Sequence, residues 1–385
     1  MKTADPELMR AINRFHVMDA IRRFGPISRV EIADRTDLSP TTVSAITALL
    51  IDDKLIVPKS TGALRDAARG RPRVMLEMNP EAAYVTGVKL APSRMTIVTT
   101  NFRADILHSV SLPTRLEGKS ASAIAAIIED GVRRSVRAAG LGMDDINGVC
   151  VGIPGVVERA AGRCRQSPIF RERDVPLGEE LSRRLGVPVT LDSDVNLVTL
   201  AEHWFGHGRG LDDFLVVSIE HSLGLGIMHN GELFRGANGL SPDLGDILVR
   251  PPSPDHNTPD RLAMVVTDDG LTRRNGNGYG GADPGAYAAA AASLGMAIAN
   301  LITLFAPPKV ILAGGALAAG ENLLQPLRAA VEEFTPPSLA DVSEIIVDQS
   351  GDETWARGGA VMTLRELYGA PWNSTGPAAH RQASR

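Results

Sequence analysis

The 385-residue sequence is poor in cysteine and in long hydrophobic segments. Its two cysteines, Cys150 and Cys164, are too few for a disulfide framework, so we expect a reducing, cytoplasmic environment. No run of about 18 or more uncharged apolar residues is apparent, so we expect no membrane span. The N-terminal segment MKTADPELMRAINRF lacks an apolar stretch between a basic start and a small-residue cleavage site, which argues against a secretory signal.

Charge is distributed unevenly along an otherwise ordinary composition. Hydrophobic residues make up 44% and charged residues 22% of the chain, as is typical of soluble globular proteins. Residues 1–73 contain 13 Lys and Arg against 9 Asp and Glu, a net +4, whereas the remainder contains 27 against 36, a net −9. A basic head on an acidic body favours a nucleic-acid-facing N-terminus, and the length predicts two or three domains.

The N-terminal part of the sequence has the signals of three helices. Apolar residues recur at helical spacing over residues 7–24, and a Gly-Pro pair ends that run. Ser28 and Glu31 form a capping-box pattern, which predicts the start of a second helix. Ser39 followed by Pro40 predicts an N-cap and the first turn of a third helix.

The third of these helices carries the candidate DNA-reading surface. Its predicted outward face is short, uncharged and rich in hydroxyl groups, and it consists of Ser39, Thr41, Thr42, Ser44 and Thr47. Such side chains can approach base edges and phosphates with a smaller desolvation cost than carboxylates. The alternative is a three-helix bundle that binds protein or nothing.

A basic loop between two strand-like segments predicts a wing. The segments are residues 55–57 and 74–76, and Arg69-Gly70-Arg71-Pro72 lies between them. Extended arginines such as Arg69 and Arg71 are suited to a narrow minor groove of DNA, although the loop is equally consistent with a solvated linker. Together with the three helices, the loop predicts a winged helix-turn-helix domain over residues 1–79.

Beyond Asn79-Pro80 the sequence alternates between strand and helix signals. Strands are predicted at 84–90, 95–100, 146–151, 188–191 and 310–313. Helices are predicted at 121–139, 177–185, 196–205 and 287–304. This is an α/β pattern, in which ligand chemistry is expected at the strand ends.

Several short motifs in this part of the chain resemble the ROK family of repressors, open reading frames and sugar kinases. In chain order they are GIPG (152–155), DSDVN (192–196), the strand pair around Gly231, RGANG (235–239), DLGD (243–246) and ILAGG (311–315). The resemblance covers nearly the whole chain and implies an actin-like, hexokinase-type ATPase fold with two lobes around a sugar cleft. It also implies that Asp194 matches the kinase general base, with Ser193 where an asparagine commonly binds the sugar.

The two phosphate-binding loops of the kinase branch are altered in this chain. The first, a DxGGT-type loop that holds ATP phosphates and magnesium, corresponds to residues 89–93, KLAPS, where lysine replaces the carboxylate and proline lacks an amide donor. The second, GTGxGxG, corresponds to residues 220–226, EHSLGLG, where a carboxylate would repel a phosphate. We therefore expect no ATP binding, although Gly314-Gly315 either matches the adenosine loop or forms a tight turn.

The structural zinc site found in many ROK proteins has no counterpart in the sequence. Those members carry EIGH followed by CxCGxxGCxE, whereas this chain has Asp243-Leu244-Gly245-Asp246 and no cysteine over residues 250–274, so we expect no zinc. The resemblance implies that Asp243 and Asp246 stand where a glutamate and a histidine contact sugar hydroxyls in sugar-binding relatives.

Each candidate ligand-binding residue has a structural alternative. The candidates are Gly155, Ser193, Asp194, His221, Asp243 and Asp246. Aspartates at a strand end before a helix, such as Asp192 and Asp194, often serve as N-caps. His221 would equally be a hydrogen-bonded residue of a turn.

These observations predict a cytoplasmic transcriptional regulator, a repressor, that binds operator DNA as a homodimer or homotetramer and senses a sugar or sugar-like effector. The predicted parts are a winged helix-turn-helix domain (1–79), a small lobe (80–194), a large lobe (195–370) whose C-terminal helix returns to the small lobe, and a disordered tail (371–385). We expect no cofactor and no enzyme activity. The alternatives are an ATP-dependent sugar kinase and a DNA-binding regulator without a small-molecule effector.

Overall fold

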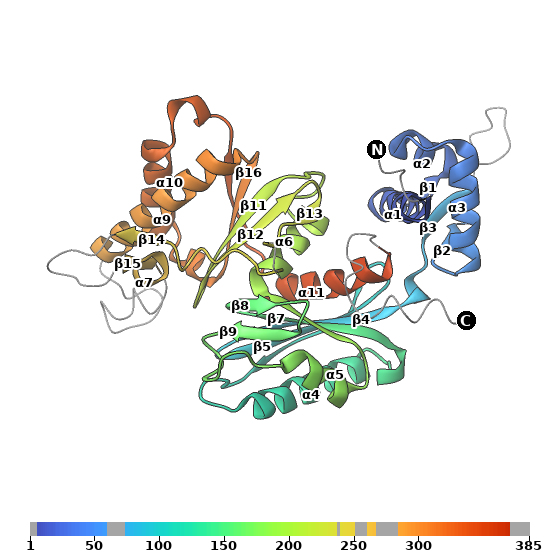
Figure 1. Cartoon of the computed structure of the whole chain (residues 1–385), viewed down its shortest axis with the longest axis horizontal. Helices are drawn as coiled ribbons and strands as arrows, with labels where there is room; N and C mark the ends of the chain where they lie inside the picture. The colour runs from blue at the N-terminus through green and yellow to red at the C-terminus, as the bar shows by residue number, and fades with distance from the viewer. Residues whose placement is uncertain (1–5, 60–73, 237–238, 251–259, 267–283, 370–385) are drawn as a thin grey trace.

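The chain folds into a small N-terminal unit beside a two-lobed body (Figure 1). The structure, a computed structural model, describes residues 6–59, 74–236, 239–250, 260–266 and 284–369. The predicted wing arginines Arg69 and Arg71 and the predicted C-terminal tail lie outside these residues.

The N-terminal unit consists of three helices and a three-stranded antiparallel sheet. The helices are α1 (Pro6–Phe24), α2 (Arg29–Thr36) and α3 (Pro40–Asp52), and the strands β1 (Ile27–Ser28), β2 (Ile56–Lys59) and β3 (Met75–Met78) lie in the order β1-β3-β2. Both predicted helix starts are confirmed. Ser28 caps α2 in a reciprocal capping box with Glu31, and the Ser39 hydroxyl accepts a hydrogen bond from the Thr42 amide at the start of α3.

The prediction that Thr47 faces outward on α3 is wrong. Its side chain is fully buried, and its hydroxyl accepts a hydrogen bond from Arg29 Nε at 2.8 Å. Val43, Thr47 and Leu50 follow a spacing of four and three residues, which places all three on the face of α3 that packs inward. The exposed positions of the predicted surface are Ser39, Thr41 and Ser44, and Thr42 is half-buried.

The two lobes of the body repeat one arrangement of strands and helices. The small lobe has the sheet order β10-β7-β4-β5-β6 and the large lobe the order β17-β16-β11-β12-β13. In each sheet the first three strands of the chain are antiparallel neighbours, and the last two add in parallel beside the first. The chain therefore contains two copies of a β-β-β-α-β-α-β-α unit.

The small lobe spans β4 to α6 in the chain. Its elements are β4 (Tyr84–Ala91), β5 (Arg94–Asn101), β6 (Ile106–Pro113), α4 (Ala121–Ala138), β7 (Ile146–Ile153), the hairpin β8 (Val156–Glu158) and β9 (Arg163–Gln166), α5 (Leu177–Leu185), β10 (Val189–Ser193) and α6 (Asp194–Phe205). Short 3₁₀ turns occur at Pro80–Ala82 and Met143–Asp145.

The large lobe follows the same order with one excursion. Its elements are β11 (Phe214–Ile219), β12 (Leu223–His229), β13 (Glu232–Leu233), α9 (Pro284–Phe305), β16 (Lys309–Ala313), α10 (Glu321–Phe334), β17 (Glu344–Val347) and α11 (Asp352–Leu367). The excursion between β13 and α9 contains β14 (Leu248–Arg250), β15 (Asp260–Arg261) and α7 (Leu262–Val266). Gly314-Gly315 leads into a 3₁₀ turn, Gly315–Ala319, before α10 begins.

The helices α6 and α11 join the two lobes. Helix α11 packs on β4, β5 and β7 of the small-lobe sheet and on α6, and α6 in turn packs on β11 and β12 of the large lobe. The packing is close enough to require glycine. A Cβ at Gly87 of β4 would lie 1.8 Å from the Ala356 carbonyl oxygen, and one at Gly358 would lie 1.9 Å from that of Leu197.

Helix α9 contains a long apolar segment, contrary to the expectation that the chain has none. Within the described residues, Ala288–Phe305 is the one helical window long and apolar enough to cross a membrane, and half of it is buried inside the protein. Ser293, Asn300 and Thr303 interrupt its run of apolar residues. Helix α9 packs along α10, so it serves as a core helix of the large lobe.

Candidate functional site

Strand ends of the small-lobe sheet bring three segments to one edge. The parallel strands β4, β7 and β10 end together, because Lys89 pairs with Gly152 and Ser193 pairs with Ile153. The predicted motifs at Gly152–Gly155 and Asp192–Asn196 therefore share this edge with the lysine of β4. Carboxyl ends of parallel strands are where α/β folds bind ligands.

Asp192 is held by two arginines at this edge. Its side chain is 2% exposed, and Oδ2 accepts hydrogen bonds from Arg235 Nη2 at 2.6 Å and Arg159 Nη1 at 3.1 Å. Oδ1 accepts from the Ser193 amide at 2.8 Å and from Asn196 Nδ2 at 2.6 Å. Burial opposes ionisation, but the guanidiniums of Arg235 and Arg159 hold the pKa of Asp192 below its usual value. Asp192 is thus an ionised structural anchor.

Asp194, two residues later, has a raised pKa, whereas the pKa of Asp192 is lowered. It is 5% exposed and accepts a hydrogen bond from the Val195 amide at 2.8 Å. Burial, together with the nearby Glu220 carboxylate, raises the pKa of Asp194 to about 7, with Lys89 opposing the shift. Near neutral pH a large fraction of Asp194 is therefore protonated and able to donate a hydrogen bond as well as accept one.

Asn196 connects the two lobes beside these aspartates. Its Nδ2 donates to Asp192 Oδ1 and also to Ser241 Oγ, at 2.5 Å, in the large lobe. Its side-chain carbonyl oxygen is buried without a hydrogen-bond partner. Asn196 belongs to the DSDVN motif and Arg235 to the RGANG motif, but the sequence indicates no role for either. Arg159 belongs to no motif, because ion pairs between distant segments leave no local signal.

Lys89 forms a second charged cluster at the same edge. Its side chain is 2% exposed, and Nζ lies 2.8 Å from Glu220 Oε1 and 2.7 Å from Asp352 Oδ1. The ammonium also lies 3.6 Å from the centroid of the Trp355 ring. Burial opposes the charged form, but the two carboxylates raise the pKa of Lys89 above its usual value. Lys89 thus ties β4 to the large lobe and to the start of α11.

The remaining candidates differ in how the structure places them. Gly155 has φ +112°, and a Cβ there would lie 2.3 Å from the Gln166 carbonyl oxygen, so its backbone requires glycine. Ser193 is buried and precedes α6 without a capping hydrogen bond from its side chain. Asp194 is the first residue of α6, and neither it nor Asp192 is the N-cap residue.

Three further candidates lie on the exposed surface. His221 is exposed in the turn between β11 and β12. Asp243 and Asp246 are exposed as well; Asp243 accepts from the Gly245 amide at 2.9 Å, and Asp246 forms an ion pair with Arg261 at 3.4 Å. Among the described residues, no hydrogen bond or ion pair joins Asp243 or Asp246 to Asp194.

The described part of the chain offers no metal site. Within them, no group of three or more His, Cys, Asp or Glu side chains is arranged to hold a metal ion. Cys150 and Cys164 are buried and unpaired, and burial raises the pKa of the Cys164 thiol to about 12. Both cysteines therefore remain protonated at neutral pH.

The duplicated lobes with a charged edge between them define an actin-like ATPase fold. Residues 86–260 match the ROK family, so the chain carries a ROK family domain. It is 24% identical over 94% of its length to the xylose repressor of Caldicellulosiruptor bescii, of which it covers 98%. It is 30% identical over 64% of its length to the DNA-binding transcriptional dual regulator NagC of Escherichia coli K12, of which it covers 59%.

Solved structures agree on the fold. A ROK family transcriptional regulator, a homolog of the E. coli MLC protein, superposes with a TM-score of 0.77 at 22% identity and covers 96% of this chain and 99% of its own. A ROK family glucokinase from Streptomyces griseus, in complex with glucose and AMPPNP, gives a TM-score of 0.60 at 21% identity and covers 73% of this chain and 99% of its own. The chain spans about three fifths of NagC and of a further Caldicellulosiruptor relative.

Proposed function

We propose that this chain is a transcriptional regulator, a repressor, that binds operator DNA through its N-terminal unit and a sugar or sugar-like effector between its lobes. The observation that carries this proposal is the Lys89 cluster. Residues at both positions where the kinase branch has phosphate loops, Lys89 and Glu220, form an ion pair with each other at 2.8 Å.

That ion pair is the reason to favour a regulator over a sugar kinase. A nucleotide phosphate at this edge would have to displace the pair and then face the carboxylates of Glu220 and Asp352, and like charges repel. The lysine is already neutralised by those carboxylates and buried, so it is not free to hold a phosphate. We infer that ATP is neither bound nor hydrolysed, and we expect neither zinc nor another cofactor.

The proposed effector site lies around Asp194. A partly protonated carboxyl group is both a hydrogen-bond donor and an acceptor, as sugar hydroxyls require. Asn196 supplies a carbonyl oxygen with no partner two residues further on, and Ser193 and Gly155 lie at the same edge. His221, Asp243 and Asp246 remain proposed contacts, which would need the lobes to approach each other around the ligand.

The proposed DNA-binding element is a winged helix-turn-helix. Helix α3 follows α2 after a short turn and exposes Ser39, Thr41 and Ser44, with Thr42 half-buried beside them. The sheet order β1-β3-β2 places β2 and β3 as the strands that flank residues 60–73. We propose that Arg69 and Arg71 of that segment reach the minor groove.

Ion pairs connect the proposed effector site to the end of α11 that lies beside α1. Arg159 pairs with Asp192 and also with Glu366 of α11. The residue before Glu366, Arg365, pairs with Glu232 of β13, and both line a cavity together with residues of α1. Effector binding near Asp192 would therefore act on the end of α11 that faces α1, provided that the effector binds one arrangement of the lobes better than the other.

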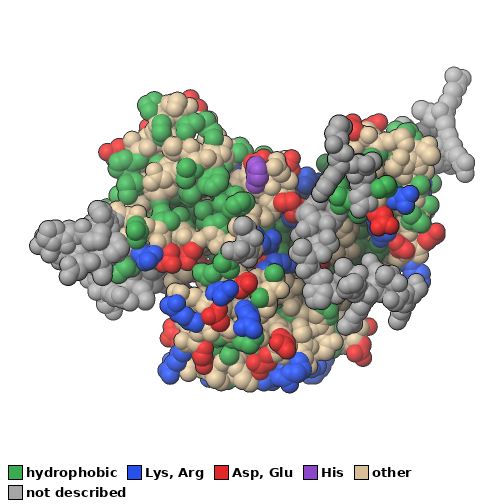
Figure 2. Space-filling view, in the orientation of Figure 1, with side chains coloured by type: hydrophobic (Ala, Val, Ile, Leu, Met, Phe, Trp, Pro, Cys, Tyr) green, Lys and Arg blue, Asp and Glu red, His purple; other side chains and the backbone are tan. Residues whose placement is uncertain are grey.

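Assembly into a homodimer or homotetramer on a palindromic operator completes the proposal. Figure 2 shows hydrophobic side chains gathered over the large lobe, whereas Lys, Arg, Asp and Glu side chains are interspersed over the small lobe. On the large lobe, Leu304 is 75% exposed, and Phe305 and Phe334 are each 47% exposed. Exposed apolar groups of this kind favour an interface between copies of the chain.

Operator binding in the presence of sugars tests the function. Promoter fragments retained by the protein would be titrated with and without a panel of sugars, sugar phosphates and polyols, and one member is expected to weaken retention. Asp194→Ala should keep operator affinity and lose that response. A normal response in the variant would remove Asp194 from the site, ATP turnover with any sugar would establish the kinase, and an operator affinity unchanged by the whole panel would leave a regulator without an effector.

The wing is tested by salt dependence. Replacing Arg69 and Arg71 by alanine should weaken operator binding and reduce the slope of log affinity against log salt by about one for each lost phosphate contact. Arg134→Ala, an exposed arginine on α4 far along the chain from the wing, is the matched control and should leave the slope unchanged. An unchanged slope in the wing variant would exclude the wing from DNA binding.

A further inference from the structure

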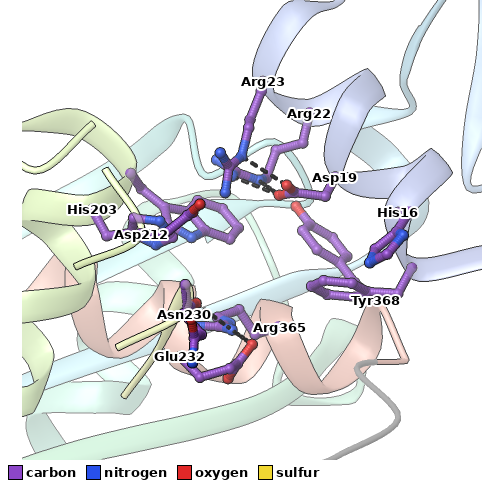
Figure 3. A pocket seen from close by; sticks show the side chains of 13 residues that line it. His16, Asp19, Arg22, Arg23, His203, Asp212, Asn230, Glu232, Arg365 and Tyr368 are labelled. Carbon is purple, nitrogen blue, oxygen red and sulfur yellow. Dashed lines mark hydrogen bonds and ion pairs between the residues drawn. The ribbon is translucent and has the colours of Figure 1, made fainter. Parts of the chain in front are cut away.

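A cavity between the N-terminal unit and the body is separate from the proposed effector site, and its lining includes neither Asp192 nor Asp194. It has a volume of about 300 Å³, the lower end of the range for small-molecule sites. One wall is α1, and the others are the end of α6, the β12–β13 hairpin and the end of α11 (Figure 3). A molecule bound there would touch both the N-terminal unit and the body.

His203 is the first sign that this cavity takes a ligand. Its side chain is 5% exposed and lines the cavity, and neither ring nitrogen has a hydrogen-bond partner. A neutral imidazole carries one donor and one acceptor, and leaving both unsatisfied in the interior destabilises a fold by about 1–3 kcal/mol for each group. A leucine would fill this position without that cost, so packing alone does not explain the histidine.

The second sign is an excess of cationic donors around His203. On α1, Asp19 is the single carboxylate between Arg22 and Arg23, with oxygens 2.7 Å from Arg22 Nη2 and from Arg23 Nε. This group of three keeps a net positive charge, and the Arg23 Nε–H has no hydrogen bond of good geometry although it is buried. Figure 3 shows these side chains pointing toward His203.

The body contributes a further arginine and an aromatic support. Arg365 of α11 is buried and pairs with Glu232. Trp204 is stacked between Tyr368 and the guanidinium of Arg22, whose carbon lies 4.0 Å from the centroid of the Trp204 ring. Burial first, and then the charges of Arg365, Arg23 and Arg22, lower the pKa of His203 to about 3, with Asp19 opposing.

The mouth of the cavity has a different chemistry. Asp212 and Asn230 are exposed there, and Glu232 and His16 also line it. Carboxylate and amide groups are suited to hydroxyl groups of a ligand. The cavity thus has a cationic, donor-rich end and a rim of acceptors.

We propose that this cavity binds a small hydroxylated organic anion, with its carboxylate or phosphate oxygens at His203 and Arg23 and its hydroxyl groups toward Asp212 and Asn230. Anion binding draws a proton from solvent onto the free ring nitrogen of His203, so that both nitrogens donate. The charged groups that act on this imidazole are Asp19, Arg22 and Arg23 from α1 and Arg365 from α11. His16 from α1, Glu232 from β13, Asp212 before β11 and Tyr368 also line the cavity. Because the anion contacts α1 and the body together, it fixes the N-terminal unit in this position.

The test is a direct binding titration of the full chain without DNA. Inorganic phosphate, glucose 6-phosphate, gluconate and uncharged glucose would be added at low millimolar concentration and constant ionic strength, at pH 6 and pH 8. The readouts are thermal unfolding and the fluorescence of Trp204, one of three tryptophans in the chain. At least one anion is expected to bind, about tenfold or more tightly at pH 6 than at pH 8 because a proton is taken up.

Variants separate this site from general effects of anions. His203→Leu should raise the melting temperature of the unliganded protein and abolish the anion-dependent shift. Arg23→Gln should weaken binding at least tenfold, as expected for the loss of a charge-assisted hydrogen bond, whereas Arg10→Gln, an exposed position on the same helix, should bind as the parent does.

The outcomes identify or exclude the ligand class. Binding of phosphate and glucose 6-phosphate alone assigns a phosphate, and binding of gluconate alone assigns a carboxylate. Binding by none of the anions, equal shifts in Arg23→Gln and Arg10→Gln, or a destabilised His203→Leu that binds like the parent would overturn the proposal. These results do not depend on operator binding or on Asp194, so this proposal and the proposed function can fail separately.

Discussion

Two charged clusters join the lobes and have opposite charge arrangements. In one, the buried cation of Lys89 lies between the carboxylates of Glu220 and Asp352. In the other, the buried anion of Asp192 lies between the guanidiniums of Arg159 and Arg235. Each cluster joins strands of the small lobe to the large lobe.

The clusters differ in what they leave available. The ammonium of Lys89 is held by two carboxylates and an aromatic ring. Beside Asp192, by contrast, Asn196 keeps an unpaired carbonyl oxygen and Asp194 has a pKa of about 7. The comparison indicates that the Lys89 cluster is an internal ion-pair network, whereas the Asp192 edge includes groups that can exchange hydrogen-bond partners.

Removing the charge of Asp192 should lower the free energy of unfolding more than removing that of Lys89. Asp192→Asn breaks ion pairs of a buried carboxylate and leaves Arg235 without its counterion and Arg159 with Glu366 alone, which should destabilise the protein by about 3–5 kcal/mol. Urea unfolding at pH 7 measures this. Asp130→Asn, which removes an exposed carboxylate paired with Arg134 on α4, is the control and should cost about 0.5 kcal/mol or less.

Asp194→Asn should raise the free energy of unfolding near neutral pH, whereas Asp192→Asn lowers it. The folded-state pKa of about 7 lies above the unfolded value, so the folded chain holds a proton that the unfolded chain has lost between pH 4 and pH 7. Stability from this group is fully present below about pH 4 and is lost as the pH rises to 7. The free energy of unfolding of the variant, relative to that of the parent, is expected to rise over that range by about 4 kcal/mol at most. The difference should then stay constant up to pH 8. A constant difference across pH would contradict the assignment.

Lys89→Met should cause the next largest change in the free energy of unfolding. It leaves the carboxylates of Glu220 and Asp352 together without their cation, but both are partly exposed and Arg94 still pairs with Asp352, so a loss of about 2 kcal/mol is expected. Adding Glu220→Gln should restore part of that loss, because it removes one of the unpaired charges. Lys59→Met, at a surface pair, serves as the control in the same unfolding experiment.

Arg94→Gln should have the smallest effect. Arg94 pairs with Asp352 Oδ2 at 2.8 Å, but its side chain is 56% exposed, so its removal should cost about 0.5 kcal/mol and less at high salt. A loss as large as that of Lys89→Met would show that the exposed arginine, rather than the buried lysine, holds the start of α11.

Features governed by neighbouring residues could be predicted from the sequence. The capping box of Ser28 and Glu31 and the cap at Ser39 are complete within four residues, and the structure has both. Thr47 shows the limit of such reasoning. The spacing of Thr47 from Val43 and Leu50 favours the buried face, whereas its hydroxyl group favours the exposed face. The spacing is decisive because Arg29, on another helix, satisfies the hydroxyl group inside the protein. The sequence gives no sign of that partner.

The charged clusters could not be predicted because their members are far apart in sequence. Lys89 and Glu220 were each recognised as changes in a phosphate loop, yet 131 residues separate them and 263 separate Lys89 from Asp352. Nothing local indicates that these charges meet. The same holds for His203. Its spacing in the sequence indicates no metal site, and its proposed role in anion binding depends on the arginines of α1.

The duplicated topology gives the junction of the lobes a direction. Lys89 lies inside β4, whereas Glu220 directly follows β11, the equivalent first strand of the other half. The two charges of the ion pair therefore come one from each half and from different positions along the repeated unit. The junction is asymmetric in its side chains although the two halves share one order of strands and helices.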